Sequence, residues 1–421
     1  MSNLKELIQQ HCPDGVEYKK LGELGVFYGG LSGKTKEDFK DGNAKFISYK
    51  NVFYNLSLNI DTDERVKIEE GEKQNTVQYG VFLFTGSSET PDECGMSSVL
   101  TQKTDEKLYL NSFCFGFRLH NPELFCPNFL KHLFRSSELR KQIGKTASGT
   151  TRFNVSKKRF AEVSIPILPL PIQEEIARIL DDFAELQAEL QAELQKRLQQ
   201  YNYYRDKLLS FNDLNGGGYA VSVEWKKLGD IATDWYRGAG IKRDEVSEKG
   251  TPCIRYGEIH TTYNIWFDEC VSHTDENKQP AKKYADYGDI LFAITSEDIP
   301  FIGNSVAYIG KERILVGGDI VVMKHTQNPK YMSYVLSTSD AVMQKGKGKV
   351  KSKVVHTNVP SLKEIVVPIP SLEEQERIAT ILDKFYALTT DITAGLPAEI
   401  EARRKQYEYY RDQLLTFKQK A

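Results

Sequence analysis

The chain has 421 residues, of which 40% are hydrophobic and 27% are charged. This length exceeds one ordinary domain and allows two or three domains with their own cores. The composition is typical of a soluble globular protein and excludes a largely disordered chain. With 56 basic and 58 acidic residues the formal net charge is −2, which argues against a uniformly basic nucleic-acid-binding protein but leaves local segregation of charge open.

The lack of a recognisable targeting signal and the scattered cysteines predict a cytoplasmic protein. No apolar run approaches the roughly 20 residues needed to cross a bilayer. The first residues include Glu6 and lack an apolar core followed by a cleavage site, so no signal peptide is expected. The six cysteines are scattered, without a C-x-x-C pair or a paired Cys/His spacing. Reduced thiols and no structural metal are therefore expected.

The sequence contains an internal duplication, which shows first in its globular parts. The string V-E-Y-K-K-L-G-E-L at 16–24 recurs as V-E-W-K-K-L-G-D-I at 223–231. Likewise Y-G-V-F-L-F at 79–84 recurs as Y-G-D-I-L-F at 287–292, followed by S-S-E in the first copy and T-S-E in the second. Ordered matches at a nearly constant offset indicate two copies of one unit.

The densest matches come late in each copy. The pattern P-I-x-x-L-x-x-Q-E-x-I-A-x-I-L-D-x-F occurs at 166–183 and at 368–385. The string Y-N-Y-Y-R-D-K-L-L-S-F at 201–211 recurs as Y-E-Y-Y-R-D-Q-L-L-T-F at 407–417. Each copy therefore begins with a globular part, about 1–168 or 219–369, and ends in a helical region.

The globular parts read as mixed strands and turns. Phe113, Phe115, Phe117 and Leu119 alternate with smaller or polar residues, which predicts a half-buried strand. Clusters of Gly with Asp or Asn, such as Asp41-Gly-Asn, indicate turns between the elements.

The helical region of the first copy predicts one long helix. Apolar residues recur in steps of three or four from Ile176 to Leu208, prolines precede the run, and Asn215-Gly-Gly-Gly follows it as a flexible linker. About 35–40 helical residues would make a rod on the order of 50–60 Å. The matching helix of the second copy is the expected packing partner, although two ordinary domain-capping helices are the alternative. Pro397 predicts a break or kink in that second helix.

Three strings resemble catalytic motifs and are discounted. The stretch 28–35 resembles a phosphate-binding loop, but Tyr28 occupies the position of the required first glycine. Pro91-Asp92 with Asp105-Glu-Lys107 fits a loose nuclease pattern that the second copy does not repeat. A methyltransferase would need a glycine-rich turn and an N-P-P-Y-type loop, and the histidines show no metal-ligand spacing. No catalytic residue and no metal site are predicted.

A basic stretch without acidic residues occurs in both copies just before the helical region. Residues 140–159 carry seven basic residues, and 344–353 form a Lys-Gly repeat followed by His356. Lysines on glycine-containing loops suit DNA phosphates, and neighbouring polar side chains could reach base edges; a solvated surface loop is the alternative. The candidate DNA contacts are Lys34, Lys145, Thr150, Thr151, Arg152, Lys157, Lys158, Lys345, Lys347, Lys349, Lys351, Lys353 and His356.

The patterns at 166–183 and 201–211, with their copies at 368–385 and 407–417, resemble the conserved regions of type I restriction–modification specificity subunits. The resemblance covers the whole chain. It implies an α+β protein with a pseudo-twofold internal repeat. Two globular, mixed α/β target-recognition domains would be separated by two long helices packed as an antiparallel coiled coil. The implied domains are 1–168 and 215–369 for target recognition, 169–214 for the central helix and 370–421 for the C-terminal helical region.

The resemblance also implies a non-catalytic role and partners. Each recognition domain would read one half of a bipartite site on double-stranded DNA, and the helices would set the spacing. They would dock two methyltransferase subunits and, through these, restriction/translocase subunits. S-adenosylmethionine, ATP and Mg²⁺ would be bound by those partners and no cofactor by this chain. The candidate partner contacts, for which a role in the helix core is the alternative, are Tyr201, Tyr204, Arg205, Tyr407, Tyr410 and Arg411.

Two functions from other classes remain as alternatives. A helical scaffold without a DNA role predicts no salt-dependent DNA binding. A stand-alone nuclease or methyltransferase predicts turnover with Mg²⁺ or a methyl donor alone. The recognised DNA sequence, the spacer length and the subunit stoichiometry cannot be derived from the sequence.

Overall fold

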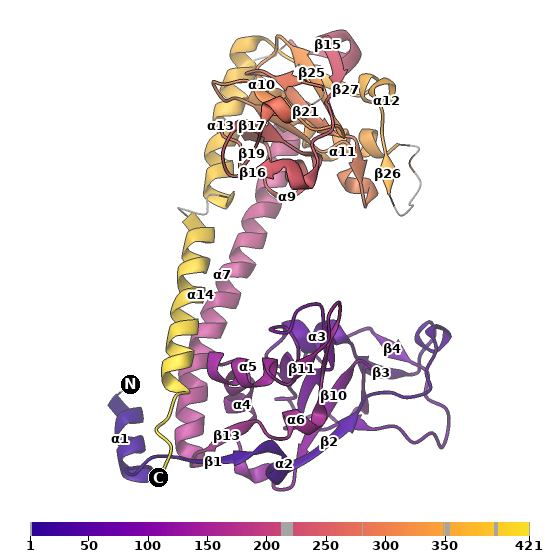
Figure 1. The fold of residues 1–421 in the computed structure, drawn as a ribbon. Coiled ribbons are helices and arrows are strands. Elements are labelled where there is room, and N and C mark those ends of the chain that lie inside the picture. The colour runs from indigo at the N-terminus through magenta and orange to yellow at the C-terminus, as the bar shows by residue number, and fades with distance from the viewer. Residues whose placement is uncertain are drawn as a thin grey trace. The chain divides into compact units, whose positions relative to one another are not determined.

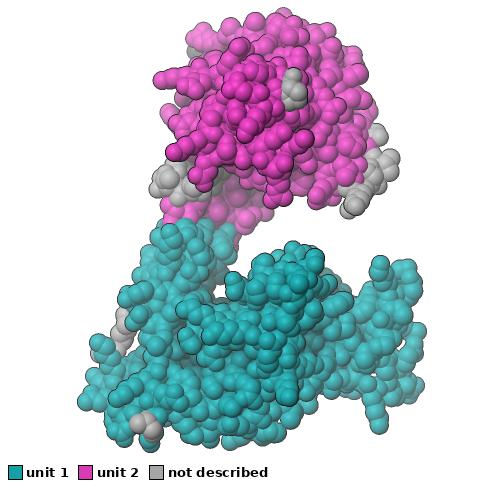
Figure 2. Space-filling view, in the orientation of Figure 1, with its two compact units in different colours: residues 1–191, 399–421 teal, residues 192–398 magenta. Residues whose placement is uncertain are grey.

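The computed structural model describes residues 2–211, 222–279, 281–347, 349, 354–390 and 395–420. The chain forms two compact units, residues 1–191 with 399–421 (unit 1) and residues 192–398 (unit 2), which Figure 2 colours separately. Each unit combines one globular domain with parts of the helical regions. The Asn215 linker expected from the sequence lies outside the described residues.

Unit 1 contains a central antiparallel sheet and a smaller mixed sheet (Figure 1). The central sheet has the order β2 (Gly25–Gly29), β10 (Cys114–Leu119), β6 (Phe82–Thr85), β8 (Ser97–Val99). The smaller sheet has the order β4 (Arg65–Val66), β3 (Ala44–Ile47), β9 (Leu108–Leu110), β5 (Thr76–Val77). Its β3 and β9 run parallel, and its other neighbours are antiparallel.

Strand β10 corrects one expectation. Its alternating aromatic residues predict a strand with one wet face, but Cys114 to Phe117 are all buried. Phe115 and Phe117 pack into the large core of the unit, whereas Cys114 packs with Leu83 on the opposite face. β10 is also hydrogen-bonded on both edges, to β2 and β6, so it is a central strand covered on both faces.

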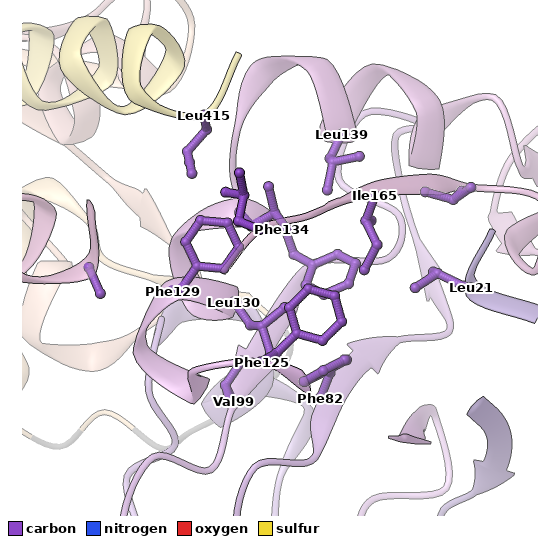
Figure 3. Packing of buried hydrophobic residues seen from close by; sticks show 14 of the residues in the cluster. Leu21, Phe82, Val99, Phe125, Phe129, Leu130, Phe134, Leu139, Ile165 and Leu415 are labelled. Atoms are coloured by element: carbon purple, nitrogen blue, oxygen red, sulfur yellow. The ribbon is translucent and has the colours of Figure 1, made fainter. Parts of the chain in front are cut away.

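The large core of unit 1 joins the sheet to helices. Helices α4 (Pro127–Leu133) and α5 (Ser137–Gly144) contribute Phe129, Leu130 and Leu139, and β6 contributes Phe82. Figure 3 shows these side chains packed together with Leu415, which follows α14 (Gly395–Leu414). Burial of such side chains stabilises the fold by roughly 1.5–3 kcal/mol each.

Unit 2 repeats this topology, and each of its two main sheets has five strands where the corresponding sheet of unit 1 has four. The central sheet has the order β15 (Ala232–Arg237), β25 (Ile320–His325), β21 (Ile290–Ala293), β23 (Ser305–Tyr308), β18 (Trp266–Phe267). The second sheet has the order β16 (Val246–Ser247), β19 (Ser272–Thr274), β17 (Thr251–Ile254), β24 (Ile314–Val316), β20 (Tyr284–Ala285). Here β17 and β24 run parallel, like β3 and β9 in unit 1.

A two-stranded pair leads into the helices in each unit. In unit 1, β1 (Glu17–Lys20) pairs with β13 (Ser164–Ile167), and Tyr18 lies opposite Pro166. In unit 2, β14 (Glu224–Lys227) pairs with β27 (Val366–Ile369), and Trp225 lies opposite Pro368. The equivalent register confirms that the sequence duplication is a structural one.

The central helix α7 (Leu170–Ser210) has 41 residues, which confirms one long helix there. Its first part packs in unit 1, where Phe183 stacks on Tyr410 of α14 with ring centroids 5.3 Å apart. Its last part packs in unit 2, where the rings of Tyr201 and Tyr386 lie 6.1 Å apart. The C-terminal region consists of two helices, α13 (Leu372–Thr390) and α14, with Pro397 in the first turn of α14.

Candidate nucleic-acid interface

A short strand, within residues 140–159 in unit 1 and just after residues 344–353 in unit 2, pairs with the Ser/Thr-rich segment of its unit. In unit 1, β12 (Phe153–Val155) lies between β11 (Ala147–Ser148) and β7 (Ser87–Ser88). In unit 2, β26 (Val355–His356) pairs with β22 (Thr295–Ser296). Asn154 lies opposite Ser87 and His356 lies opposite Thr295. Two repeated motifs thus form one repeated site.

A short helix contacts this site through a side chain in each unit. In unit 1, the Tyr49 hydroxyl at the start of α3 (Tyr49–Tyr54) donates a hydrogen bond of 2.7 Å to the Ser87 carbonyl. In unit 2, His260 of α9 (Tyr256–Thr261) lies 3.0 Å through Nε2 from the Thr295 carbonyl. The Thr295 hydroxyl in turn lies 3.3 Å from Nδ1 of His356.

The predicted contacts of unit 1 lie mostly on this surface. Arg152 donates through Nε to the Ser87 hydroxyl at 3.2 Å, and its guanidinium lies 5.5 Å from the ring centroid of the exposed Phe113. Gly149 turns the chain between β11 and β12 with φ +151°, where an added Cβ would lie 2.0 Å from the Arg152 carbonyl. The other exposed members of the surface are Lys145, Thr150, Thr151, Lys157 and Lys158.

Two basic residues of unit 1 have structural roles. Arg140, within the basic stretch, donates to the carbonyls of Gly95, Asp92 and Cys94 and is held in the fold. Lys34 was predicted to contact DNA, but its ammonium lies 2.6 Å from Glu72 and its side chain is only 8% exposed. The hydrogen bond from Lys34 lowers the pKa of Glu72 to about 2, so Lys34 is part of a loop-closing ion pair.

The basic stretch of unit 2 divides into buried and accessible parts. Lys347 and His356 are exposed and Lys349 is half-buried, whereas Lys351 and Lys353 lie outside the described residues. Lys345 was predicted to contact DNA, and the structure corrects this. Its side chain is buried, and Nζ donates to the Leu336 carbonyl at 2.8 Å and to the Ser305 hydroxyl at 3.2 Å. Burial lowers the pKa of Lys345 to about 7.

Sequence reasoning missed a pocket of about 800 Å³ in unit 2. Arg237, Arg243 and Arg255 line it together with several glycines and the exposed Tyr256. The lining comes from the end of β15, the start of α9 and the turn between β24 and β25. The only signal in the sequence was the alternation of arginine and glycine in Y-R-G-A-G-I-K-R at 236–243.

The glutamine of the pattern at 166–183 and 368–385 connects the start of a helix to the globular domain in each unit. Gln173 is fully buried; it accepts a hydrogen bond from Cys126 N at 2.8 Å and donates to the Leu168 carbonyl at 2.6 Å. In unit 2, Gln375 accepts from Asn328 N at 2.9 Å and donates to the Pro370 carbonyl at 2.9 Å. The same side chain therefore performs the same structural task in both units.

The aspartate of that motif anchors the helix preceding the basic stretch. In unit 1, Asp181 lies 2.6 Å from His132 Nε2 and 2.7 Å from Lys131 Nζ. Burial acts to raise the pKa of Asp181, but hydrogen bonds from His132 and Lys131 outweigh it and the pKa is lowered. In unit 2, Asp383 accepts from the Tyr334 hydroxyl, Trp266 Nε1 and Lys330 Nζ.

The aspartate that follows arginine in Y-x-Y-Y-R-D caps a helix in each unit. Asp412 accepts from the backbone N–H and hydroxyl of Ser137, the first residue of α5, at 2.9 and 2.6 Å. Asp206 accepts from the same groups of Ser339, the first residue of α11 (Ser339–Gly346), at 3.2 and 2.5 Å. A carboxylate is favourable at a helix N-terminus.

These contacts assign the candidate partner residues to two groups. Tyr201, Arg205 and Tyr407 are buried, and the Arg411 side chain is 13% exposed, because they form the helix core and the caps. The structure therefore corrects the prediction that these four contact a partner and favours the alternative, a role in the helix core. Tyr204 is 49% exposed and Tyr410 is half-buried against Phe183. Their neighbours Tyr203 and Tyr409, at 61% and 62%, are the most exposed tyrosines of the two motifs.

The described residues offer neither a cluster of metal ligands nor a membrane-spanning helix. They contain no group of three or more His, Cys, Asp or Glu side chains that could hold a metal ion. Among the same residues, no helix is both long and apolar enough to cross a membrane.

Comparisons with known proteins agree on one family. Residues 13–200 and 221–402 match the family model of the type I restriction modification DNA specificity domain. A type I restriction enzyme specificity subunit of Escherichia coli is 36% identical over 267 residues, 60% of this chain. A putative type I restriction enzyme specificity subunit of Haemophilus influenzae is 33% identical over 283 residues, 64% of this chain and 68% of that relative. The match spans 61% of the length of the E. coli relative.

A solved structure shows the same fold. It comes from work on complex assembly and conformational transition of the type I R-M system and superposes with a TM-score of 0.60 at 15% identity. The superposition covers 96% of this chain and 98% of that one. Fold and site thus define a duplicated two-domain protein whose domains are fixed to long helices by repeated polar anchors. With both copies matched by the family model, the chain belongs to the type I restriction modification DNA specificity family.

Proposed function

We propose that this chain is the non-catalytic subunit that gives a type I restriction–modification complex its DNA sequence specificity. The observation that carries the proposal is the repeated site in which a basic stretch lies beside a Ser/Thr-rich strand. Cationic side chains supply sequence-independent affinity for phosphates, and hydroxyl, amide and imidazole groups supply hydrogen bonds to base edges. Two such sites in one chain suit the two halves of an asymmetric bipartite DNA site.

The helices suit a spacer and docking role. In unit 1 residue 183 of α7 meets residue 410, and in unit 2 residue 201 meets residue 386. The partner number falls as α7 advances, which supports an antiparallel coiled coil and a pseudo-twofold repeat. We assign the docking of two methyltransferase subunits, and through them of restriction/translocase subunits, to the exposed helix faces around Tyr204 and Tyr410. S-adenosylmethionine, ATP and Mg²⁺ then belong to those cytoplasmic partners.

A domain exchange tests the proposal. Methylated sites are mapped in DNA from cells that express the chain with its partner subunits, and the map is repeated after residues 219–369 are replaced by the corresponding domain of another family member. We expect a bipartite motif in which the exchange alters one half only. An altered motif in both halves, or methylation that does not depend on this chain, contradicts the proposal.

The accessible lysines of the basic stretch give a second test. Replacing Lys347 and Lys349 together by alanine should weaken binding to duplex DNA about tenfold or more. Without these two cations fewer phosphates are neutralised, so fewer counterions are released from the DNA on binding. The magnitude of the negative slope of log affinity against log salt concentration should decrease by roughly one to two. Salt titrations by fluorescence anisotropy measure both quantities. An unchanged slope would show that these lysines belong to a solvated surface loop and do not contact DNA phosphates.

A further inference from the structure

The arginine-lined pocket of unit 2 is built around a close crossing of two backbones. Gly238 follows β15, and an added Cβ on it would lie 2.2 Å from the Gly317 carbonyl. The crossing also exists in unit 1, where a Cβ on Gly30 would lie 2.1 Å from the Asn111 carbonyl. Backbone bonds hold it in both units, from Ala239 N to the Val316 carbonyl and from Leu31 N to the Leu110 carbonyl. The crossing belongs to the fold, and the side chains around it are specific to each unit.

The three arginines of the pocket are held to different degrees. Arg237 is fixed, since its guanidinium donates to the Gly318 carbonyl and pairs with Asp319 at 2.6 Å. Nε of Arg255 is buried and finds no hydrogen-bond partner among the described residues. The carboxylate of Glu258 lies 3.7 Å away but already accepts from Ser272 Oγ and from the Arg255 backbone N–H. Arg243 is exposed, and no ion pair to it occurs among the described residues.

The lining is therefore cationic, with three arginines against Asp319 as the one acidic residue in it. The hollow beside the same crossing in unit 1 has the opposite balance, with Lys40 and Arg65 against Asp41, Asp63 and Glu64. The surplus of positive charge in the lining points to an anion as the ligand of the pocket.

A series of side-chain contacts links the pocket to the repeated site of unit 2. Tyr256 lines the pocket, and its ring lies edge-on to His260 at 6.2 Å. His260 contacts Thr295, whose hydroxyl meets His356. The pocket and strand β26 are thus linked through residues of α9 within one unit.

We propose that this pocket seats a phosphate of the DNA backbone, with Arg243 and Arg255 as its ligands and Arg237 as a fixed neighbour. The shape decides between phosphate and base. Base edges lie inside the grooves, and protruding side chains or elements reach them, whereas the phosphate backbone forms the outer ridges of the duplex and fits a hollow. Arginine presents a planar fork that matches phosphate oxygens. The contact would fix the register of the duplex while the Thr295 and His356 strands face the bases.

The proposal rests on the DNA-binding function proposed above, and the experiment separates the two. The full chain and its Arg243→Gln and Arg255→Gln variants are titrated with mixed-sequence duplex DNA at several salt concentrations. Each variant should bind about tenfold more weakly and lower the salt slope by about one. Lys226→Gln is the matched control, since it removes one cation from β14, outside the pocket, and should leave the slope unchanged. Tryptophan fluorescence checks folding, because Trp225, Trp235 and Trp266 all lie in unit 2.

Each outcome decides one point. Absence of salt-dependent binding by the unaltered chain overturns the proposed function itself. If the unaltered chain binds while both folded variants keep its slope, the DNA-binding function stands and the phosphate seat is wrong. Methylation maps of the same variants, made with the partner subunits, should show the unaltered motif. A relaxed base preference in one half of the motif would make the arginines base readers and overturn the phosphate assignment.

Discussion

Replacing Asp383 by alanine is expected to lower the free energy of unfolding of unit 2 by about 3 kcal/mol. Its carboxylate accepts from the Tyr334 hydroxyl at 2.6 Å, Trp266 Nε1 at 3.0 Å and Lys330 Nζ at 2.6 Å. The substitution leaves the hydroxyl of the fully buried Tyr334 without its acceptor. It also leaves the ammonium of Lys330, which lies 3.9 Å from the Trp266 ring, without its counter-ion.

The measurement uses the position of the tryptophans. All three lie in unit 2, so denaturant unfolding followed by tryptophan fluorescence reports on this unit within the full chain. Glu373→Ala is the control, because it removes an exposed carboxylate from the first turn of the same helix and should cost less than about 1 kcal/mol. Equal midpoints for the two variants would show that Asp383 is a surface charge and not an anchor.

The same variant bears on function. The anchor joins α13 to the helix α10 (Pro329–Leu336), which directly precedes α11 and the basic stretch. Loosening it should therefore impair DNA binding together with stability, whereas substitutions of exposed lysines should impair binding alone. Repeated polar residues on long helices thus carry two kinds of information, and only a structure separates anchors from docking contacts.

Local patterns allowed much of the fold to be predicted. The spacing of apolar residues from Ile176 to Leu208 specified one long helix, because a packed helix needs a continuous apolar stripe. The matching strings at 16–24 and 223–231 specified equivalent strands, because equal sequences meet equal partners. A break or kink was expected at Pro397; α14 begins at Gly395 and includes that proline in its first turn, where its missing N–H is tolerated, and residues 391–394 lie outside the described part of the chain.

Long-range pairing was beyond local patterns. The S-S-E and T-S-E segments and the basic stretches were each recognised as repeats, but strand pairing across about 60 residues has no local signature. The arginine pocket was missed for the same reason, since its lining comes from three loops that are distant in sequence. Arg205 and Arg411 were predicted as partner contacts because Ser339 and Ser137, the residues that donate hydrogen bonds to the neighbouring aspartates, lie far away in sequence.

Lys345 was misplaced although the duplication contained a warning. In the register that aligns Gln142-Ile-Gly-Lys145 with Gln344-Lys-Gly-Lys347, Lys345 takes the place of Ile143. Ile143 is fully buried in the core of unit 1, and Lys345 fills the same position in unit 2 against the ring of Phe292 at 5.9 Å. A lysine in a run of lysines looks exposed, and only comparison with its counterpart in the first copy suggests a core position.

Lys345→Met is expected to remove a pH dependence from the stability of unit 2. Burial lowers the pKa of Lys345 to about 7 in the folded chain, from 10.5 in the absence of burial. Between these two values the unfolded chain holds the proton and the folded chain does not, so the stability of the unaltered unit rises with pH across this window. Below about pH 7 both states are protonated, and the full penalty for burying the charge remains. The change across the window is on the order of 5 kcal/mol, since one pKa unit corresponds to about 1.4 kcal/mol.

Methionine has a similar length without a charge, and it gives up the hydrogen bonds to the Leu336 carbonyl and the Ser305 hydroxyl, at a cost of roughly 1 kcal/mol each. At pH 7 the variant should therefore be at least as stable as the unaltered chain, and near pH 10 it should be less stable. Denaturant unfolding followed by tryptophan fluorescence from pH 7 to pH 10 measures the crossing. Lys278→Met, an exposed lysine of the same unit, should run parallel to the unaltered chain. Parallel curves for Lys345→Met as well would mean that Lys345 stays charged in its buried position, held by the Leu336 carbonyl and the Ser305 hydroxyl.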